Sequence, residues 1–158
     1  MRHLFDETEQ KLGRVDVLIN NAGILKTAPV AESSDEMFDQ TFSINVRGTF
    51  NTLREAATRL NDGGRVVNFS STTVAMNLPN YAVYSGSKAA VEVLTPIFAK
   101  EMRGRNITIN AVAPGPVATE LFFNGKTEAQ IQQFANMPPL QRSVSYTHLR
   151  AHETRGNL

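Results

Sequence analysis

Short apolar runs alternate with segments of helical periodicity along this chain, and this alternation restricts the folds it can adopt. Strands that alternate with helices are joined through βαβ units and pair in parallel. Apolar strands without internal polar alternation are typical of sheets that helices cover on both faces. The sequence therefore predicts an α/β fold with a doubly wound parallel sheet. The expected strands span 15–20, 65–70 and 107–113, and the expected helices span 2–12, 34–60, 81–103 and 127–136.

Local signals mark the ends of the predicted helix 34–60. Ser33 and Glu36 match a capping box, in which a hydroxyl and a carboxylate three residues apart satisfy the free N–H groups of a helix start. Gly63 and Gly64 follow the last periodic residue, and glycine commonly ends helices because it tolerates the left-handed conformation. We therefore expect Ser33 to cap this helix and the two glycines to end it.

The composition indicates a single domain without a strongly charged partner. A chain of 158 residues has the length of one domain, and its 41% hydrophobic content is enough for a core. The net charge of +1, without any block of like charge, argues against nucleic acid as a partner. The sequence shows no membrane span, no secretory signal and no cysteine. These features favour a cytoplasmic protein without disulfides or membrane partners.

Small and polar residues follow the first two predicted strands. The first strand ends at Asn20 and continues into Asn21-Ala22-Gly23, where small residues allow a flat ring to approach the backbone. The second strand ends in Ser70-Ser71, and a serine hydroxyl can bind a substrate carbonyl. Ligands of open parallel sheets bind beyond the carboxyl ends of the strands, so these residues are candidates for a site. The alternative is an ordinary turn after each strand, because these residue types are common there.

Tyr84 and Lys88 are the candidate acid–base pair. Residues four apart share one face of a helix, so both side chains would project together. An ammonium beside a phenol favours the phenolate, which predicts a lowered Tyr84 pKa and a usable acid or base at neutral pH. The spacing alone is not specific, since the chain has three tyrosines and five lysines. The alternative is a surface helix with an exposed lysine and a half-buried tyrosine.

Asn45 lies inside the apolar periodicity of the predicted helix 34–60. An asparagine in a helix interior is mildly unfavourable, because its amide competes for backbone groups. On this observation alone, a structural role for Asn45 is favoured over a functional one.

These motifs follow one another in a single order, which ends with Pro114-Gly115-Pro116-Val117-Ala118-Thr119. Together they resemble the classical short-chain dehydrogenase/reductase family over residues 2–142. Among its members, those similar to 3-oxoacyl-carrier-protein reductase and glucose dehydrogenase come nearest. The resemblance implies a partial Rossmann-like sheet with strands 4, 5 and 6 of the family fold. It also implies an NAD(P)(H)-dependent enzyme that reduces a carbonyl or oxidises a secondary alcohol.

The resemblance also implies a role for each matching residue. Tyr84 would act as the general acid or base, and Ser71, thirteen residues before it, would orient the substrate oxygen. Lys88 would bind the nicotinamide ribose and lower the Tyr84 pKa, and Asn45 would hold a water in a proton relay to Lys88. The cofactor would be NADP or NAD, with NADP favoured, and no metal is expected. The implied cofactor-binding residues are Asn20, Ala22, Gly23, Tyr84, Lys88, Pro114, Gly115, Val117 and Thr119.

The sequence departs from the family pattern before Asn20. The family places a strand and a glycine-rich, pyrophosphate-binding turn ahead of this point, and no glycine cluster precedes Asn20 here. Without the family's first strand, residues 15–19 would form an exposed apolar edge. We therefore expect the first βαβ units and the last strand to be missing. An inactive fragment of such an enzyme remains the alternative.

The last sixteen residues, 143–158, also depart from the family pattern. They resemble translated vector sequence, so we expect a partial dinucleotide-binding domain at 1–142 and a non-native tail after it. His148 and His152 lie four residues apart in this tail. That spacing could suit a metal pair, but an accidental tail is favoured.

Phe122 and Phe123 follow the proline-rich loop that begins at Pro114. Their rings suit either an apolar or aromatic substrate or ordinary packing of the helix 127–136 onto the sheet, and the sequence leaves both open. By resemblance, the two long helices would form the contacts of a homodimer or homotetramer.

Overall fold

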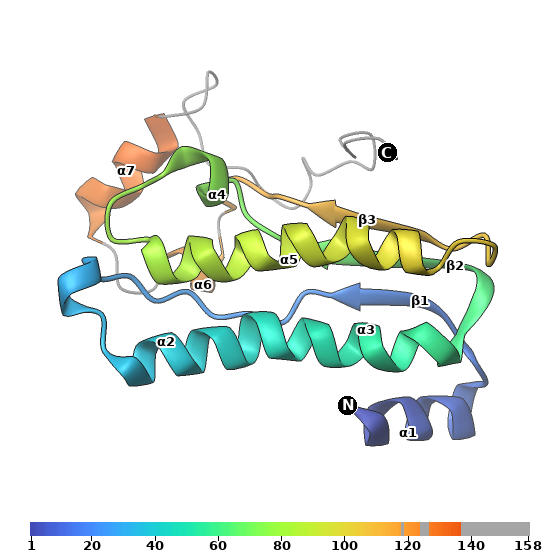
Figure 1. Ribbon diagram of the computed structural model, residues 1–158. Coiled ribbons are helices and arrows are strands. Elements are labelled where there is room, and N and C mark those ends of the chain that lie inside the picture. The colour runs from blue at the N-terminus through green and yellow to red at the C-terminus, as the bar shows by residue number, and fades with distance from the viewer. Residues whose placement is uncertain (118, 124–126, 137–158) are drawn as a thin grey trace.

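The sheet in the computed structural model confirms the predicted fold class. The structure describes residues 1–117, 119–123 and 127–136. Three parallel strands lie in the order β1 (Val15–Asn20), β2 (Leu60–Phe69) and β3 (Thr108–Val112). Their carboxyl ends point to the same end of the molecule (Figure 1). This is the arrangement that places the residues after each strand beside one another.

Two helices, α3 (Gly48–Arg59) and α5 (Ala82–Glu101), cover one face of this sheet (Figure 1). A third helix, α1 (Arg2–Leu12), contacts α3 and β1. The core between these layers is apolar, and the burial of such side chains is the main stabilising contribution to folds of this kind. Its buried members are Phe5, Leu53, Ala56, Leu60, Val66, Phe98, Met102 and Ile109.

Strand β1 forms one edge of the described sheet. Its Val17 and Ile19 side chains are 54% and 60% exposed, which confirms the expected apolar edge. The expectation that helices cover both faces of every strand is wrong at these two residues. Within the described part of the chain, α3 contacts β1 from one side only, as Figure 1 shows.

The predicted helix 34–60 consists of three helical segments. They are α2 (Asp35–Phe42), a π-helical stretch η2 (Ser43–Arg47) and α3. The cap is Ser34, whose Oγ accepts the Met37 N–H at 3.2 Å, so the prediction of Ser33 is wrong by one residue. The Ser33 hydroxyl instead donates to the Pro29 carbonyl beside the short helix η1 (Val30–Glu32).

The two glycines expected to end this helix lie within β2. The helix ends earlier, at Arg59, and the chain becomes extended at Leu60. Pairing with β1 then shifts register, since Val15 pairs with Leu60 but Val17 pairs with Arg65. Gly63 has a φ of +80°, and a Cβ on Gly64 would come within 2.9 Å of the Asp16 carbonyl. The glycines therefore permit this irregularity between the strands, which explains the error in the prediction.

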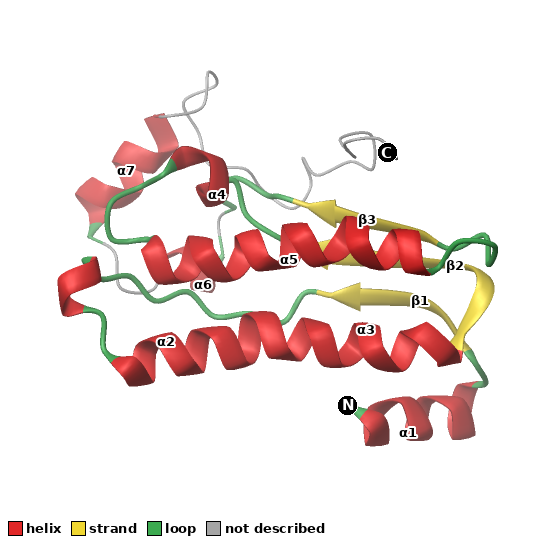
Figure 2. Cartoon of the chain, viewed as in Figure 1, coloured by secondary structure: helices red, strands yellow, loops and turns green. Residues whose placement is uncertain are grey.

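Three short helices lie at the carboxyl end of the sheet, joined to it by loops (Figure 2). They are α4 (Thr73–Met76), α6 (Glu120–Phe123) and α7 (Glu128–Asn136), and α7 matches the predicted helix 127–136. In the described part of the chain, no helix is both long and apolar enough to cross a bilayer. The predicted tail 143–158, with His148 and His152, lies outside the described residues.

Candidate active site

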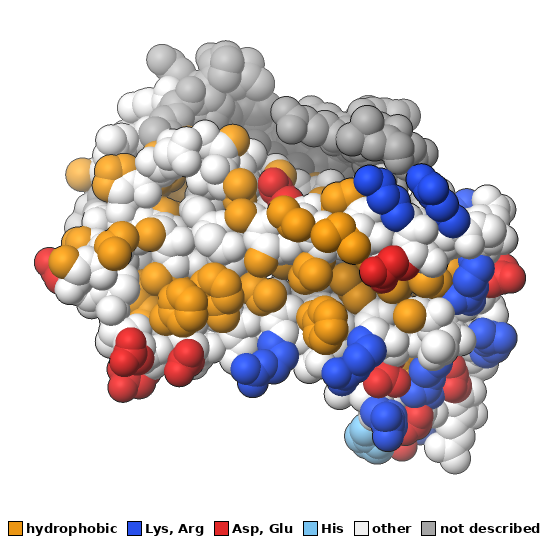
Figure 3. Space-filling view, viewed as in Figure 1, with side chains coloured by type: hydrophobic (Ala, Val, Ile, Leu, Met, Phe, Trp, Pro, Cys, Tyr) orange, Lys and Arg blue, Asp and Glu red, His pale blue; other side chains and the backbone are white. Residues whose placement is uncertain are grey.

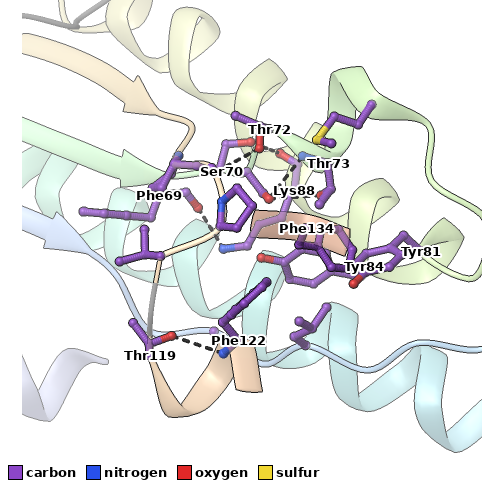
Figure 4. A pocket seen from close by; sticks show the side chains of 18 of the residues that line it. Phe69, Ser70, Thr72, Thr73, Tyr81, Tyr84, Lys88, Thr119, Phe122 and Phe134 are labelled. Carbon is purple, nitrogen blue, oxygen red and sulfur yellow. Dashed lines mark hydrogen bonds between the residues drawn. The ribbon is translucent and has the colours of Figure 1, made fainter. Parts of the chain in front are cut away.

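A cavity of about 440 Å³ opens at the carboxyl ends of the three strands (Figure 4). Its wall is formed by the segments that follow β1, β2 and β3, together with the first turns of α5 and parts of α6 and α7. Its volume is in the range of pockets that bind small molecules. All but two of the residues predicted for the site line it, namely Ala22, Gly23, Ser71, Tyr84, Lys88, Pro114, Gly115, Val117 and Thr119.

Helix α5 brings Tyr84 and Lys88 onto one face, as their spacing predicts. Both are buried, with 8% and 6% of their surface exposed, and the Lys88 Nζ lies 5.9 Å from the centre of the Tyr84 ring. The Nζ donates a hydrogen bond of 2.8 Å to the Phe69 carbonyl at the end of β2. Among the described residues this is its only hydrogen bond, so further N–H groups can serve a ligand in the cavity.

Burial shifts the pKa values of Tyr84 and Lys88 in the directions that favour the uncharged form of each side chain. Burial raises the Tyr84 pKa above its ordinary value, and a hydrogen bond with Ser71 opposes this rise only in part. Burial also lowers the pKa of the Lys88 ammonium. The predicted lowering of the Tyr84 pKa is therefore not found, because burial raises it and the hydrogen bond with Ser71 is the smaller, opposing effect. With its pKa raised above its ordinary value, the Tyr84 phenol keeps its proton at neutral pH.

Ser71 and Ser70 have different surroundings although they are neighbours. The Ser71 Oγ accepts hydrogen bonds from the Thr73 hydroxyl at 3.0 Å and from the Thr73 N–H at 3.3 Å, and it also contacts Tyr84. The Ser70 Oγ donates to the Glu92 carboxylate at 2.8 Å. The structure thus places Ser71, rather than Ser70, at the Tyr84 hydroxyl.

Asn45 lies behind the cavity wall and is 1% exposed. Its Oδ1 accepts the Ile24 N–H at 2.8 Å, and its Nδ2 donates to the Ile24 carbonyl and the Ser87 Oγ, both at 3.0 Å. These bonds tie the loop after β1 to α5. The Asn45 side chain is thus fully engaged in positioning, and its part in a proton relay stays a prediction.

Asn20 is the second predicted residue that does not line the cavity. Its Nδ2 donates to the Asn68 Oδ1 at 2.8 Å, and its Oδ1 accepts the Thr52 hydroxyl at 2.6 Å. It therefore joins β1 to β2 and to α3 just below the site. The next residue, Asn21, lines the cavity in its place.

Several lining residues were not anticipated from the sequence. Tyr81 lies three residues before Tyr84, a spacing that also shares a helix face and could have indicated it. Phe134 lies on α7, whose docking no local pattern shows. Leu25, Phe69, Thr72, Thr73, Met76 and Pro116 also line the cavity without a predicted role. Asn21, Ser70 and Phe122 line it as well, and they belong to segments that the sequence had already indicated.

The cavity fits the flat ring and ribose of a nicotinamide nucleotide at its glycine-containing side. A Cβ on Gly23 would lie 3.2 Å from the Asn45 Oδ1 and 3.3 Å from the Lys88 Nζ, so a side chain there would crowd both groups. Gly23 thus keeps the backbone open beside the free N–H groups of Lys88. Among the described residues, no three His, Asp or Glu side chains gather as a metal-ligand group.

Comparisons with known proteins agree with this arrangement. The family model described as "Enoyl-(Acyl carrier protein) reductase" matches residues 1–151. The chain is 47% identical to a "Short-chain type dehydrogenase/reductase" of Picea abies, with 88% of this chain and 53% of that protein covered. It is 43% identical to an "NADPH-dependent aldehyde reductase-like protein, chloroplastic" of Arabidopsis thaliana, with 90% and 54% covered.

The solved structures give a similar result. A short chain dehydrogenase from Burkholderia cenocepacia in complex with NADP superposes with a TM-score of 0.82 at 28% identity, with 91% of this chain and 58% of that chain covered. The chain spans about half the length of the curated relatives it matches.

Proposed function

The chain belongs to the short-chain dehydrogenase/reductase family, and from this premise we propose that the whole protein is an NADP(H)-dependent carbonyl reductase. It would reduce a carbonyl compound to a secondary or primary alcohol, or run in reverse. This proposal rests on one observation: a single cavity beyond the strand ends is lined by Ser71, Tyr84 and Lys88. The NADP-bound neighbour and the NADPH-dependent relative support the choice of cofactor.

Each of the three side chains has a distinct task in the proposed reaction. Tyr84 donates its phenolic proton to the carbonyl oxygen of the substrate, and Ser71 holds that oxygen through its hydroxyl. Lys88 binds the ribose hydroxyls of the cofactor with the N–H groups that Phe69 leaves free. Hydride transfer is the chemistry that a nicotinamide supplies when bound. Asn45 and Ser87 keep the loop after β1 in place behind these groups.

The raised Tyr84 pKa suits the residue to act as an acid. A phenol that stays protonated at neutral pH is a ready acid, whereas the base needed for alcohol oxidation would have to be generated at a cost in free energy. A protonated phenol is the form that carbonyl reduction requires of this residue.

Titration of the purified chain with NADPH tests the cofactor and the alternative of an inactive fragment together. A ligand that binds only the folded state stabilises it, and at a hundredfold excess over Kd the melting temperature should rise by about 5 °C or more. We expect a saturable rise with NADPH that is larger than the rise with NADH, together with carbonyl-dependent oxidation of NADPH by the whole protein. A flat titration of the 158-residue chain would favour the inactive fragment instead.

An exposed apolar face supports a homodimer or homotetramer. Hydrophobic side chains gather over α2, η2, α3 and the adjoining side of α5 (Figure 3). Monomeric proteins rarely expose contiguous apolar patches of this kind without a partner. Its members include Phe38, Ile44, Phe50, Val93 and Ile97, which are 36% to 60% exposed.

Replacing Phe50 with Arg is expected to separate the protomers, because a charge would be buried in the proposed interface without a partner. Light scattering should show a dimer or tetramer for the unmodified protein and a smaller species for F50R. The control is Leu12→Arg, since Leu12 is 85% exposed and lies on α1, away from this face. A monomeric unmodified protein would reject the proposed assembly.

The compartment forms the last part of the proposal. We propose a cytoplasmic enzyme, on the basis of its composition. The Arabidopsis relative carries "chloroplastic" in its name, so imaging of the tagged whole protein in its own cells is the relevant measurement.

A further inference from the structure

Three aromatic side chains line the cavity on the side of the Tyr84 ring (Figure 4). Tyr81, Phe122 and Phe134 form what we term the ring cluster. The ring centres lie 6.4 Å apart for Tyr81 and Tyr84, 6.3 Å for Tyr81 and Phe134, and 5.7 Å for Phe122 and Phe134. All three pairs meet edge to face, with interplanar angles of 64° to 81°.

The ring cluster is separate from the hydrophobic core. Its members come from three different segments, the start of α5, α6 and α7, and each of them lines the cavity. None belongs to the core cluster beneath the sheet or to the half-buried residues packed against it. The rings are only half-buried, so they retain surface that a ligand can cover.

We propose that the ring cluster is the substrate subsite and that the substrate is an uncharged, planar aryl aldehyde or ketone. This inference rests on the proposed function, because it takes the Tyr84 hydroxyl as the group that meets the carbonyl oxygen. The aryl ring would lie against Phe122, Phe134 and Tyr81, and the carbonyl would point towards Ser71 and Tyr84.

The chemistry of the wall favours an aromatic ring over a saturated one. Edge-to-face contacts depend on the quadrupole of aromatic rings, so a flat ligand ring can extend the pattern that the cluster already shows. Met76 also lines the cavity, and its polarizable thioether makes favourable contacts with aromatic groups.

The charge of the wall favours a neutral substrate. Among the described lining residues, Lys88 is the only Lys, Arg, His, Asp or Glu side chain, and it is assigned to the cofactor. The hydroxyls of Ser71, Thr72 and Thr73 lie on the segment after β2, and the ring cluster carries a single polar side-chain group, the Tyr81 hydroxyl. A substrate with a polar carbonyl end and an apolar aryl end matches this division.

Matched pairs of substrates test the proposal on the whole protein with NADPH. Benzaldehyde is compared with cyclohexanecarbaldehyde, and 2-naphthaldehyde with its fully saturated analogue. We expect kcat/KM to be about tenfold higher for each aryl aldehyde, as two or more additional ring contacts would give. Conjugation makes the aryl aldehydes intrinsically less electrophilic, so such a preference must come from binding.

Phe134→Leu should lower this aryl preference several-fold, because it removes a ring but keeps an apolar side chain of similar volume. The control is Phe38→Leu, which changes a phenylalanine on α2 that is 46% exposed and does not line the cavity. The control should keep the preference of the unmodified protein. If Phe134→Leu does not fold, Phe122→Leu and the substrate pairs on the unmodified protein still decide the question.

The outcomes separate this inference from the proposed function. Equal kcat/KM for aryl and saturated aldehydes, with NADPH consumed in both cases, would overturn the aromatic subsite and leave the reductase intact. An aryl preference that Phe134→Leu and Phe122→Leu leave unchanged would also overturn it, and the rings would then only pack α7 onto the sheet. No NADPH-dependent turnover of any aldehyde or ketone would reject the proposed function itself.

Discussion

Tyr84→Phe is expected to lower kcat by a factor of about 10²–10⁴ while NADPH affinity stays nearly unchanged. The variant removes the hydroxyl that would protonate the carbonyl oxygen, and general acid catalysis contributes rate factors of this size. The ring itself is retained, so its contacts with Tyr81 and with Lys88 are preserved. Steady-state kinetics and a fluorescence titration of NADPH would measure the two quantities separately.

Tyr81→Phe is the matched comparison, since it removes the same group from a tyrosine one helical turn away. It should reduce turnover far less than Tyr84→Phe. For the unmodified protein, kcat/KM for reduction should stay constant through neutral pH and fall at alkaline pH, where the Lys88 ammonium, whose pKa is lowered, and the Tyr84 phenol, whose pKa is raised, lose their protons. Retention of turnover by Tyr84→Phe would show that another group supplies the proton.

The position of the candidate site can be predicted from the order of the strands and helices along the chain. Parallel strands bring their carboxyl ends to one edge, so Gly23, Ser71 and Pro114 can be placed together without knowledge of any contact. Likewise, the helical repeat is enough to put Tyr84 and Lys88 on one face. These parts of the site depend on chain order and secondary structure, and both can be read from the sequence.

The electrostatic state of Tyr84 does not follow from spacing. The sequence shows that a lysine is near but not how deeply both groups are buried. In the folded protein, desolvation raises the pKa of the phenol, and the Lys88 ammonium bonds to the Phe69 carbonyl. A pKa depends on the balance of burial and charge, so only the three-dimensional structure gives its direction.

The surroundings of Asn45 cannot be predicted from local sequence patterns either. Its hydrogen-bond partners, Ile24 and Ser87, lie 21 and 42 residues away in the sequence. The π-helical stretch around it inserts an irregularity that an averaged helical period does not show. Such stretches occur frequently at functional sites, and here one sets Asn45 against the loop that carries Gly23.

Most of the ring cluster could not be predicted from the sequence either. Tyr81 could be found from its spacing to Tyr84, but Phe134 reaches the cavity only because α7 brings its ring against Tyr81. Of the two adjacent phenylalanines, Phe122 lines the cavity and Phe123 does not. A sequence motif cannot distinguish neighbours whose roles depend on the direction of one short helix.

Lys88→Met is expected to weaken NADPH binding by a factor of about 10–100 and to lower turnover as well. Methionine is close in length to lysine and has a similar unbranched side chain, so the fold around α5 should persist. The variant loses the ammonium that would bind the ribose, and hydrogen bonds to a charged group contribute about 1.5–3 kcal/mol each. The hydrogen bond to the Phe69 carbonyl is lost with it. Isothermal titration would give Kd, and steady-state assays at saturating NADPH would give kcat.

Lys100→Met provides the control, because Lys100 is an exposed lysine near the other end of the same helix. It should leave both Kd and kcat unchanged. A combined loss of affinity and turnover in Lys88→Met alone would assign both tasks to the buried lysine. If Lys88→Met instead bound NADPH as tightly as the unmodified protein, the ribose would have to be held by other groups. The cavity would then need a different orientation of the cofactor, with Tyr84 no longer beside the reacting carbon.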